Sequence, residues 1–233
     1  MKDTWASGTL ELLRHADSHI KLDSAFDKRI AFISIDNCVE TAIRTFVSLP
    51  FNKSGVRISR KEIDDTGNSF PKLVALLFKH AANRVVGLDD GDIEHYHRIR
   101  NQLYHDGTGL SVDERYLSAY RQIASVLLNN LFGVEIAPED NQQPSLERLI
   151  LLWNAIESAL RNRLMSAGID YRYTYKWEQA VQAGILDMQV IQDITELRML
   201  RNKQVHSTSD ELDRERISFG VSLAERILER LKG

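Results

Sequence analysis

Apolar residues recur every three or four positions along most of this chain, and this spacing is typical of amphipathic α-helices. The strongest stripe runs from Phe32 to Leu49, and Pro50 helps to stop it. The segment 51–69 has turn residues without a sustained period, so we expect a long loop there. The predicted helices cover residues 9–22, 32–49, 71–81, 89–105, 111–131, 149–159, 176–184, 193–206 and 217–231.

Polar residues with helix-capping spacing stand where several of these stripes begin. Asp89 or Asp90 is the expected N-cap of the helix over 89–105, because a carboxylate accepts hydrogen bonds from the first backbone N–H groups. The pairs Ser111–Glu114 and Thr208–Glu211 have the spacing of a capping box. Each pair predicts the start of a helix.

The helical pattern occurs twice along the chain. The stretch Asn37–Arg44 matches Asn154–Arg161, with asparagine, glutamate, alanine and arginine identical at equivalent positions. A polar helix and then an apolar closing helix follow each stretch in the same order. Residues between the copies are mostly polar and include two prolines. We therefore predict an all-α protein with domains 1–133 and 146–233, joined by a linker over 134–145.

Composition agrees with a soluble helical protein. Hydrophobic residues make up 43% and charged residues 27%, and the 12 glycines and 4 prolines are few for a turn-rich β architecture. The formal net charge of -3 provides no global field for nucleic acid or anionic membranes, so a polyanion needs a local patch. The single cysteine, Cys38, lies in an apolar helical pattern and is expected in the core.

The start of the chain lacks the basic and then apolar layout of a signal peptide. No uninterrupted apolar run is long enough to span a bilayer. These two observations favour a cytoplasmic protein without a membrane partner.

The candidate chemistry lies in a motif, R-N-x-x-x-H, that occurs once in each half. On a helix, the asparagine and the histidine four residues later lie nearly above one another, and the arginine beside them reaches by its length. A guanidinium suits phosphate oxygens, and an imidazole is suited to moving protons near neutral pH. The residues are Arg100, Asn101 and His105 in the first copy and Arg201, Asn202 and His206 in the second.

Two such copies facing each other about a pseudo-two-fold axis would form a composite site with two residues of each kind. That set suits the cutting of a phosphodiester by an internal 2′-hydroxyl attack. Imidazole or hydroxyl activation, protonation of the leaving oxygen and stabilisation of the charged phosphorane by arginine are the steps it would supply. No glycine loop of the usual nucleotide-binding kinds is present, and we expect no cofactor.

The motif, its place on the penultimate helix of each unit and the long helix before it resemble the HEPN superfamily (higher eukaryotes and prokaryotes nucleotide-binding). The family pattern is an arginine, four to six intervening residues and a histidine, often with asparagine, aspartate or histidine directly after the arginine. Both copies in this chain fit it. The resemblance covers nearly the whole length and implies two fused HEPN-like helical bundles with dimeric or pseudo-dimeric packing.

In function, the resemblance implies metal-independent endoribonuclease activity, here as a toxin or phage-defence effector, with no metal ligand and no cofactor. The partners it implies are an RNA substrate, an antitoxin or defence-complex protein, and a second copy of the chain. The arginines would bind the scissile phosphate and stabilise its transition state. The histidines would act as acid and base or would position the 2′-hydroxyl, and the asparagines would hold the imidazoles or the substrate. These roles fall on Arg100 and Arg201, His105 and His206, and Asn101 and Asn202.

The chain departs from one HEPN subgroup at a single position of the motif. A prominent toxin subgroup has a tyrosine two residues after the histidine, which a partner nucleotidyltransferase modifies. This chain has Gly107 and Thr208 there, so that regulation is not expected. Tyr104, inside the first motif, is interpreted as a packing residue.

Other polar residues admit simpler interpretations beside functional ones. Glu40 and Glu157 each precede an arginine by four residues, which favours an ordinary helix ion pair over the alternative that they orient the motif arginines. His95 and His97 point to nearly opposite sides of a helix, so we expect a solvated basic face rather than a metal site.

Two further hypotheses remain for the chain as a whole. In one, a catalytically silent HEPN-like module binds RNA, a nucleotide or a partner protein in a defence or toxin–antitoxin complex. In the other, the repeated motif serves helix packing only. The first is distinguished from a nuclease by whether alanine at either motif abolishes toxicity without weakening RNA binding, whereas the second predicts that the same substitutions mainly destabilise the fold.

Overall fold

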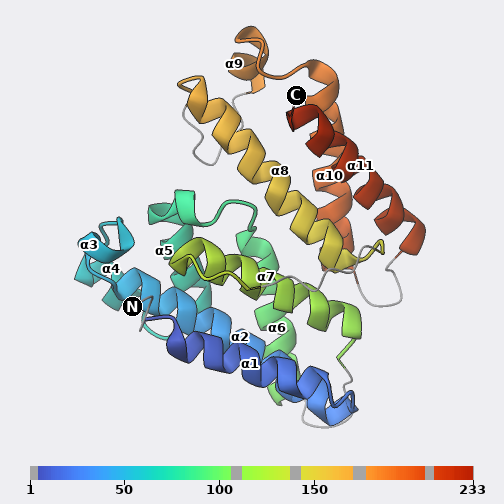
Figure 1. Cartoon of the computed structure of the whole chain (residues 1–233). Helices are drawn as coiled ribbons and strands as arrows, with labels where there is room; N and C mark the ends of the chain where they lie inside the picture. Colours follow the sequence, from blue (N-terminus) through green and yellow to red (C-terminus); the bar gives the residue numbers. More distant parts are fainter. Residues whose placement is uncertain (1–4, 106–111, 137–142, 170–176, 208–212, 233) are drawn as a thin grey trace. The chain divides into compact units, whose positions relative to one another are not determined.

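Every regular element of the described chain is helical, which confirms the all-α prediction. The chain forms two compact units, residues 1–138 and 139–233, and their boundary falls inside the segment 134–145. The protein is seen here as a computed structural model (Figure 1), which describes residues 5–105, 112–136, 143–169, 177–207 and 213–232.

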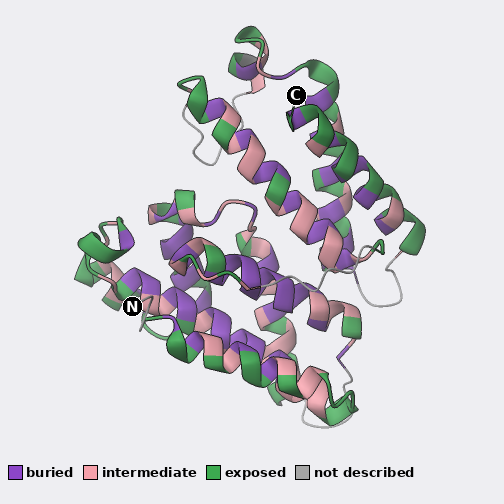
Figure 2. Ribbon diagram, in the orientation of Figure 1, coloured by how far each residue is buried: buried purple, intermediate pink, exposed green. Residues whose placement is uncertain are grey.

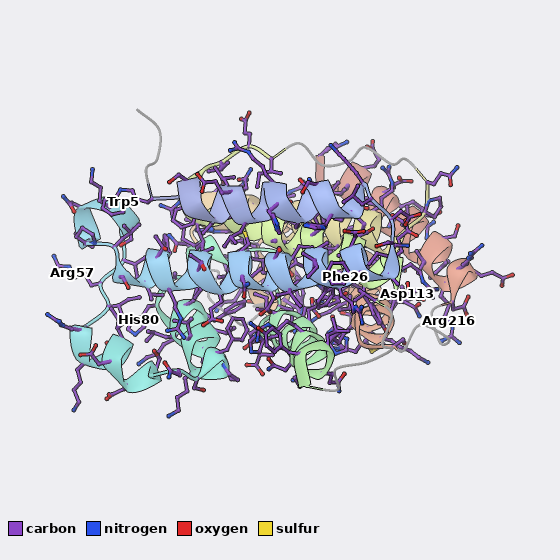
Figure 3. All side chains as sticks on the ribbon, turned by 90° about the horizontal axis from the view of Figure 1, so that it is seen from below. Trp5, Phe26, Arg57, His80, Asp113 and Arg216 are labelled. Carbon is purple, nitrogen blue, oxygen red and sulfur yellow. The ribbon has the colours of Figure 1, made fainter. Side chains whose placement is uncertain are left out.

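The first unit is built around one long helix, α2. Helix α1 lies beside it along its length, as Figures 1 and 3 both show, and α5, α6 and α7 also pack against it. The elements of the unit are α1 Ser7–Ile20, α2 Ala25–Ser48, α3 Phe51–Ser54, α4 Arg60–Thr66, α5 Phe70–His80, a 3₁₀ turn Ala82–Arg84, α6 Asp90–His105 and α7 Glu114–Phe132.

The apolar stripe of the sequence becomes the core of this unit. Ser24 begins α2 by accepting a hydrogen bond from the backbone N–H of Asp27, and the helix ends just before Pro50. Phe32, Ile35 and most other apolar residues of the stripe are fully buried, and Figure 2 shows buried residues where the helices of the unit meet. Helix α2 therefore supplies the central packing face against which α6, the first motif helix, is held.

The prediction of a long loop over 51–69 was wrong, because α3 and α4 lie there. Ser59 and Glu62 form a capping box at the start of α4, with each side chain satisfying the other's backbone N–H. The Glu62 carboxylate also accepts from Lys79 at 3.0 Å and lies 2.9 Å from Nε2 of His80, which Figure 3 labels at the end of α5. Hydrogen bonds from Lys79, then Ser59, lower the pKa of Glu62 to about 2.

The helix caps differ in detail from those expected. Helix α7 begins after Asp113, whose side chain accepts from the backbone N–H of Arg115, while the expected Ser111 lies outside the described residues. At α6, Oδ1 of Asp89 accepts from the backbone N–H of Gly91. The capping pair expected at 208–211 also lies outside the described residues.

The second unit is smaller, and its closing helix, α11, packs against both α8 and α10. Gly220 permits this approach, because a Cβ there would lie 2.7 Å from Cδ2 of Leu200 on α10 and 3.3 Å from Cδ1 of Leu149 on α8. No described helix of either unit has the length and apolarity that crossing a bilayer requires. The elements of the unit are α8 Leu146–Ser166, α9 Trp177–Gln182, α10 Met188–His206 and α11 Arg214–Lys232.

Candidate functional site

Each R-N-x-x-x-H motif occupies the last turns of a helix, α6 in the first unit and α10 in the second. The side chain of His105 lies outside the described part of the chain, so the first motif is described through Arg100 and Asn101. Arginine and histidine near a helix C-terminus interact favourably with its dipole, which helps to explain why the sequence folds as helix up to the histidine in both copies.

Arg100 is held by three side chains, two of them from α2. Its Nη1 donates to Oδ1 of Asn101 at 3.0 Å, and its Nη2 donates to Oδ1 of Asn37 at 3.3 Å. Its Nε lies 3.3 Å from Oδ2 of Asp36, an ion-pair distance. The side chain remains 23% exposed, so the guanidinium is oriented by the protein and still reaches solvent.

Asp36 is the centre of this arrangement, and it was not predicted as a site residue. Its carboxylate is fully buried on α2 and accepts a hydrogen bond from the Tyr120 hydroxyl of α7 at 2.7 Å. Nδ1 of His97 lies 3.0 Å from its Oδ1. A buried carboxylate is stable only when paired and hydrogen-bonded, so the charge of Asp36 fixes Arg100, His97 and Tyr120 around one point.

A signal for Asp36 exists in the sequence. It stands four residues after Phe32 and three before Val39, so it shares the buried face of α2 with apolar residues. A charged residue in the middle of an apolar stripe indicates a buried ionic partner. Asn37 offered a second signal, because it recurs as Asn154 in the other copy.

The prediction that His97 lies on a solvated basic face of α6 was wrong. Its side chain is largely buried, and its ring stacks on Phe70 of α5 with centroids 3.9 Å apart and planes 16° apart. The stack and the contact with Asp36 fix both the position and the orientation of the imidazole. His97 is therefore part of the wall beside Arg100 rather than a surface side chain.

An open pocket of about 500 Å³ lies beside Arg100 in the first unit. One wall is the first turn of α5 with the residues before it, another is α6, and Glu40 contributes from α2. Two asparagines, two arginines and two glutamates line it, so it presents hydrogen-bond donors and acceptors together. The lining residues are Glu40, Asn68, Ser69, Phe70, Pro71, Glu94, His97, Arg98, Arg100 and Asn101.

The two glutamates of the pocket lie close to arginines. Oε1 of Glu40 accepts from Nε of Arg44 at 2.9 Å, which confirms the helix ion pair, while the motif arginine is paired with Asp36 instead. Glu94 lies 4.0 Å from Nη1 of Arg98. Both pairs are partly exposed, so a bound ligand can compete for these charges at small cost.

Tyr104 was interpreted as a packing residue, but its side chain is exposed. The guanidinium of Arg100 lies over the Tyr104 ring, 5.2 Å from its centroid, a cation–π contact. The tyrosine ring therefore lies against the motif arginine while most of its side chain is exposed.

The second motif differs from the first in its exposure. Arg201 is only 1% exposed, and its Nη1 donates to Oδ1 of Asn202 at 3.2 Å. Glu157 of α8 is also buried, whereas His206 is exposed. In both motifs the asparagine accepts from the preceding arginine, so its amide orients the guanidinium, a role that was not predicted.

Burial perturbs two groups near Asp36. The pKa of the Tyr120 hydroxyl lies well above its usual value because the group is buried and because the charge of Asp36 is adjacent. Burial, with a smaller effect of the Asp17 charge, raises the pKa of Cys38 to about 12. Cys38 is fully buried, which confirms its expected place in the core. Among the described residues, no group of three or more His, Cys, Asp or Glu side chains could hold a metal ion.

Comparisons of this chain with known proteins found no relative. No protein-family model matches the sequence, and no match was found among curated proteins or solved structures. The functional assignment therefore depends on the motifs and on the contacts described above.

Proposed function

We propose that this chain is a metal-independent endoribonuclease built from two HEPN-like units, and that both R-N-x-x-x-H motifs take part in its reaction. The observation that carries the proposal is the setting of Arg100. Its guanidinium is oriented by Asp36 and two asparagine oxygens, lines a pocket and reaches solvent. A cation held in this way is preorganised for an anionic ligand.

The hydrogen-bonding capacity of Arg100 supports a phosphate as that ligand. A guanidinium carries five N–H donors, and the hydrogen bonds to Asn37 and Asn101 use one N–H of each Nη, while Nε lies at an ion-pair distance from Asp36. Each Nη keeps one further N–H, and two such groups suffice for a bidentate phosphate contact. Because the pairing with Asp36 fixes the guanidinium before binding, little side-chain entropy is lost when the phosphate arrives.

The mixed lining of the pocket favours a nucleotide over a simple anion. The carboxylates of Glu40 and Glu94 can accept hydrogen bonds from ribose hydroxyls or base amino groups, and the amide of Asn68 can both donate and accept. Asn101 lies beside the phosphate-binding arginine in the same pocket. A strand of RNA supplies all of these groups within one nucleotide step.

The proposed reaction is an internal transesterification. One motif histidine, His105 or His206, accepts the proton of the 2′-hydroxyl as its oxygen attacks the adjacent phosphorus. The bond to the 5′-oxygen then breaks, and this oxygen takes a proton from the other histidine. Arg100 stabilises the extra negative charge on the phosphorane. The products are a 2′,3′-cyclic phosphate and a 5′-hydroxyl, and no metal is needed for either proton transfer.

A second candidate function is a non-catalytic module that binds RNA, a nucleotide or a partner protein. The burial of Arg201 favours it, because only the arginine of the first motif is partly exposed. A toxin or phage-defence role, with an antitoxin or defence-complex partner, belongs to the same proposal as the HEPN-like assignment. Toxicity on expression, lost in motif variants, is the expected cellular result.

The experiment that separates these functions measures cleavage and binding in the same variants. We expect His105→Ala and His206→Ala to abolish cleavage of RNA while affinity for a 2′-O-methyl RNA of the same sequence, which cannot be cleaved, changes less than about threefold, less than one lost hydrogen bond of about 1 kcal/mol. The matched control is His80→Ala, which removes a histidine of the first unit that contacts Glu62 rather than the pocket. RNA binding without cleavage by the native chain would favour the binding module.

A further inference from the structure

We infer that the two motif arginines have different roles: Arg100 is the phosphate-binding guanidinium, and Arg201 is a structural residue of the second unit. This inference rests on the proposed function, and it assigns phosphate recognition to the pocket of the first unit. The two arginines therefore do not have the equal roles that the repeated motif implies. They differ in exposure, in their partners and in the residues at equivalent positions of the repeat.

The two arginines differ in exposure, although they occupy the same position of the motif. Arg100 is 23% exposed and lines the pocket, whereas Arg201 is 1% exposed and is among the largest fully buried side chains. A phosphate bound by Arg201 would have to displace the surrounding side chains and lose its own hydration at the same time. An arginine buried to this degree is stable when its charge is paired or hydrogen-bonded inside the protein.

At the position of Asp36, the buried carboxylate that positions Arg100, the second copy has an apolar side chain. When Asn37 is matched with Asn154, the position of Asp36 becomes Trp153, a buried apolar side chain on α8. In the register that matches Arg100 with Arg201, the position of His97 becomes Arg198 and that of Tyr120 becomes Val221. These replacements remove the carboxylate, the imidazole and the hydroxyl together.

The contrast explains how one motif can have two outcomes. In the first unit, the buried carboxylate of Asp36 on α2 lies at an ion-pair distance from the guanidinium, and the arginine also lines the pocket. In the second, an indole takes that position, and the guanidinium is held inside the unit with Asn202 as one acceptor. The arginine–asparagine bond is common to both copies, so it does not determine whether the arginine reaches a ligand.

Chemical modification of the intact chain tests the accessibility part of this inference. Phenylglyoxal should modify Arg100 in the native chain, and a 2′-O-methyl RNA should protect it, whereas Arg201 should react only after unfolding. Arg121 is the buried control because it is 8% exposed and paired with Asp17 away from the pocket. Mass spectrometry of peptides after digestion gives the extent of reaction at each site. Native modification of Arg201 that RNA prevents would overturn the inference.

Binding variants test the functional part. Arg100→Met should weaken binding of the 2′-O-methyl RNA by about tenfold to a hundredfold, because one charge-assisted phosphate contact is lost. The slope of log Kd against log salt concentration should fall by about 0.7, the value for one contact with a single strand. Arg201→Met should lower thermal stability but leave both the affinity and the slope of the folded protein unchanged.

The outcomes distinguish this inference from the proposed function. If the native chain binds no RNA and cleaves none, the proposed function fails and the division of roles fails with it. If the native chain binds RNA but folded Arg201→Met loses affinity and salt slope as much as Arg100→Met does, only the division of roles is overturned. Arg201→Lys covers the case in which the methionine variant does not fold, because it keeps the charge and the same affinity is expected.

Discussion

At the scale of single residues, the buried carboxylate of Asp36 connects three helices of the first unit. Asp36 stands on the most apolar face of α2, where an unpaired carboxylate would cost far more than the stability of a domain of this size allows. The surrounding cation, imidazole and hydroxyl compensate that cost. The same ion pair holds Arg100 in the lining of the pocket. A contact that stabilises the fold therefore also orients a residue of the candidate site.

Replacing Asp36 should therefore be costly. We expect Asp36→Ala to lower the free energy of unfolding by about 3 kcal/mol or more, because it leaves Arg100 and Tyr120 without a shared partner in the interior. Hydrogen exchange in the peptides of α2 and α7 measures the loss. Glu40→Ala, which breaks only the partly exposed pair with Arg44, is the control and should cost about 0.5 kcal/mol. Equal losses in both variants would contradict the central place given to Asp36.

Because of Cys38, the free energy of unfolding should fall at alkaline pH. The thiol ionises near its ordinary pKa of 9.0 in the unfolded chain, but burial raises its pKa to about 12 in the folded one. Its contribution is therefore constant below about pH 9 and is lost as pH rises from 9 towards 12, by up to about 1.4 kcal/mol per pH unit. The buried Tyr120 hydroxyl adds a loss in the same direction above pH 10.

We expect urea midpoints measured from pH 8 to 11 to fall less steeply in Cys38→Ala than in the native chain. Because burial keeps the thiol protonated, Cys38 should also fail to react with a thiol reagent at pH 8 until urea is added. Parallel pH profiles of the two proteins, or rapid labelling of the native chain, would be inconsistent with this setting of Cys38.

At the scale of helices, periodicity predicted the long elements well and the short ones poorly. The apolar stripe over 32–49 corresponds to α2, since a sustained period of three and four residues determines which face is buried. Helices α3 and α4 were missed because four and seven residues are too few to show a period. The capping pair Ser59–Glu62 was the available signal for α4.

The site was predictable in part for the same reason. The motifs could be found because their spacing lies within one helix. The contact of Arg100 with Asp36 joins two helices that are far apart in the sequence, and periodicity does not specify which faces of different helices meet. The unequal burial of Arg100 and Arg201 follows from such contacts, so two identical local patterns gave no warning of it.

Helix α4 offers a direct test of capping. We expect Ser59→Ala to destabilise α4 by about 1 kcal/mol, because the backbone N–H of Glu62 loses its acceptor. Faster hydrogen exchange should appear in residues 60–66, while exchange in α2 changes little. Ser18→Ala is the control, since its hydroxyl donates to the carbonyl of His15 within α1 and caps no helix start. Unchanged exchange in 60–66 would show that contacts with α5 alone hold α4.

At the scale of the whole molecule, two compact units carry one repeated motif in two settings. The net charge of -3 provides no general attraction for RNA, so the RNA recognition that we propose requires the charged groups of a local site. The pocket beside Arg100 has that character, with an oriented guanidinium and several polar side chains. Repetition of a sequence pattern thus provides two candidate sites, and the packing of each unit determines what its copy presents to solvent.

The central claim is that this chain cleaves RNA by 2′-hydroxyl attack without a metal. The most direct measurement is incubation of the purified chain with RNA in EDTA, followed by mass spectrometry of the new ends. We expect 2′,3′-cyclic phosphates and 5′-hydroxyls, with cleavage lost in folded His105→Ala and His206→Ala. Cleavage that EDTA abolishes, or that leaves 5′-phosphates and 3′-hydroxyls, would contradict this claim.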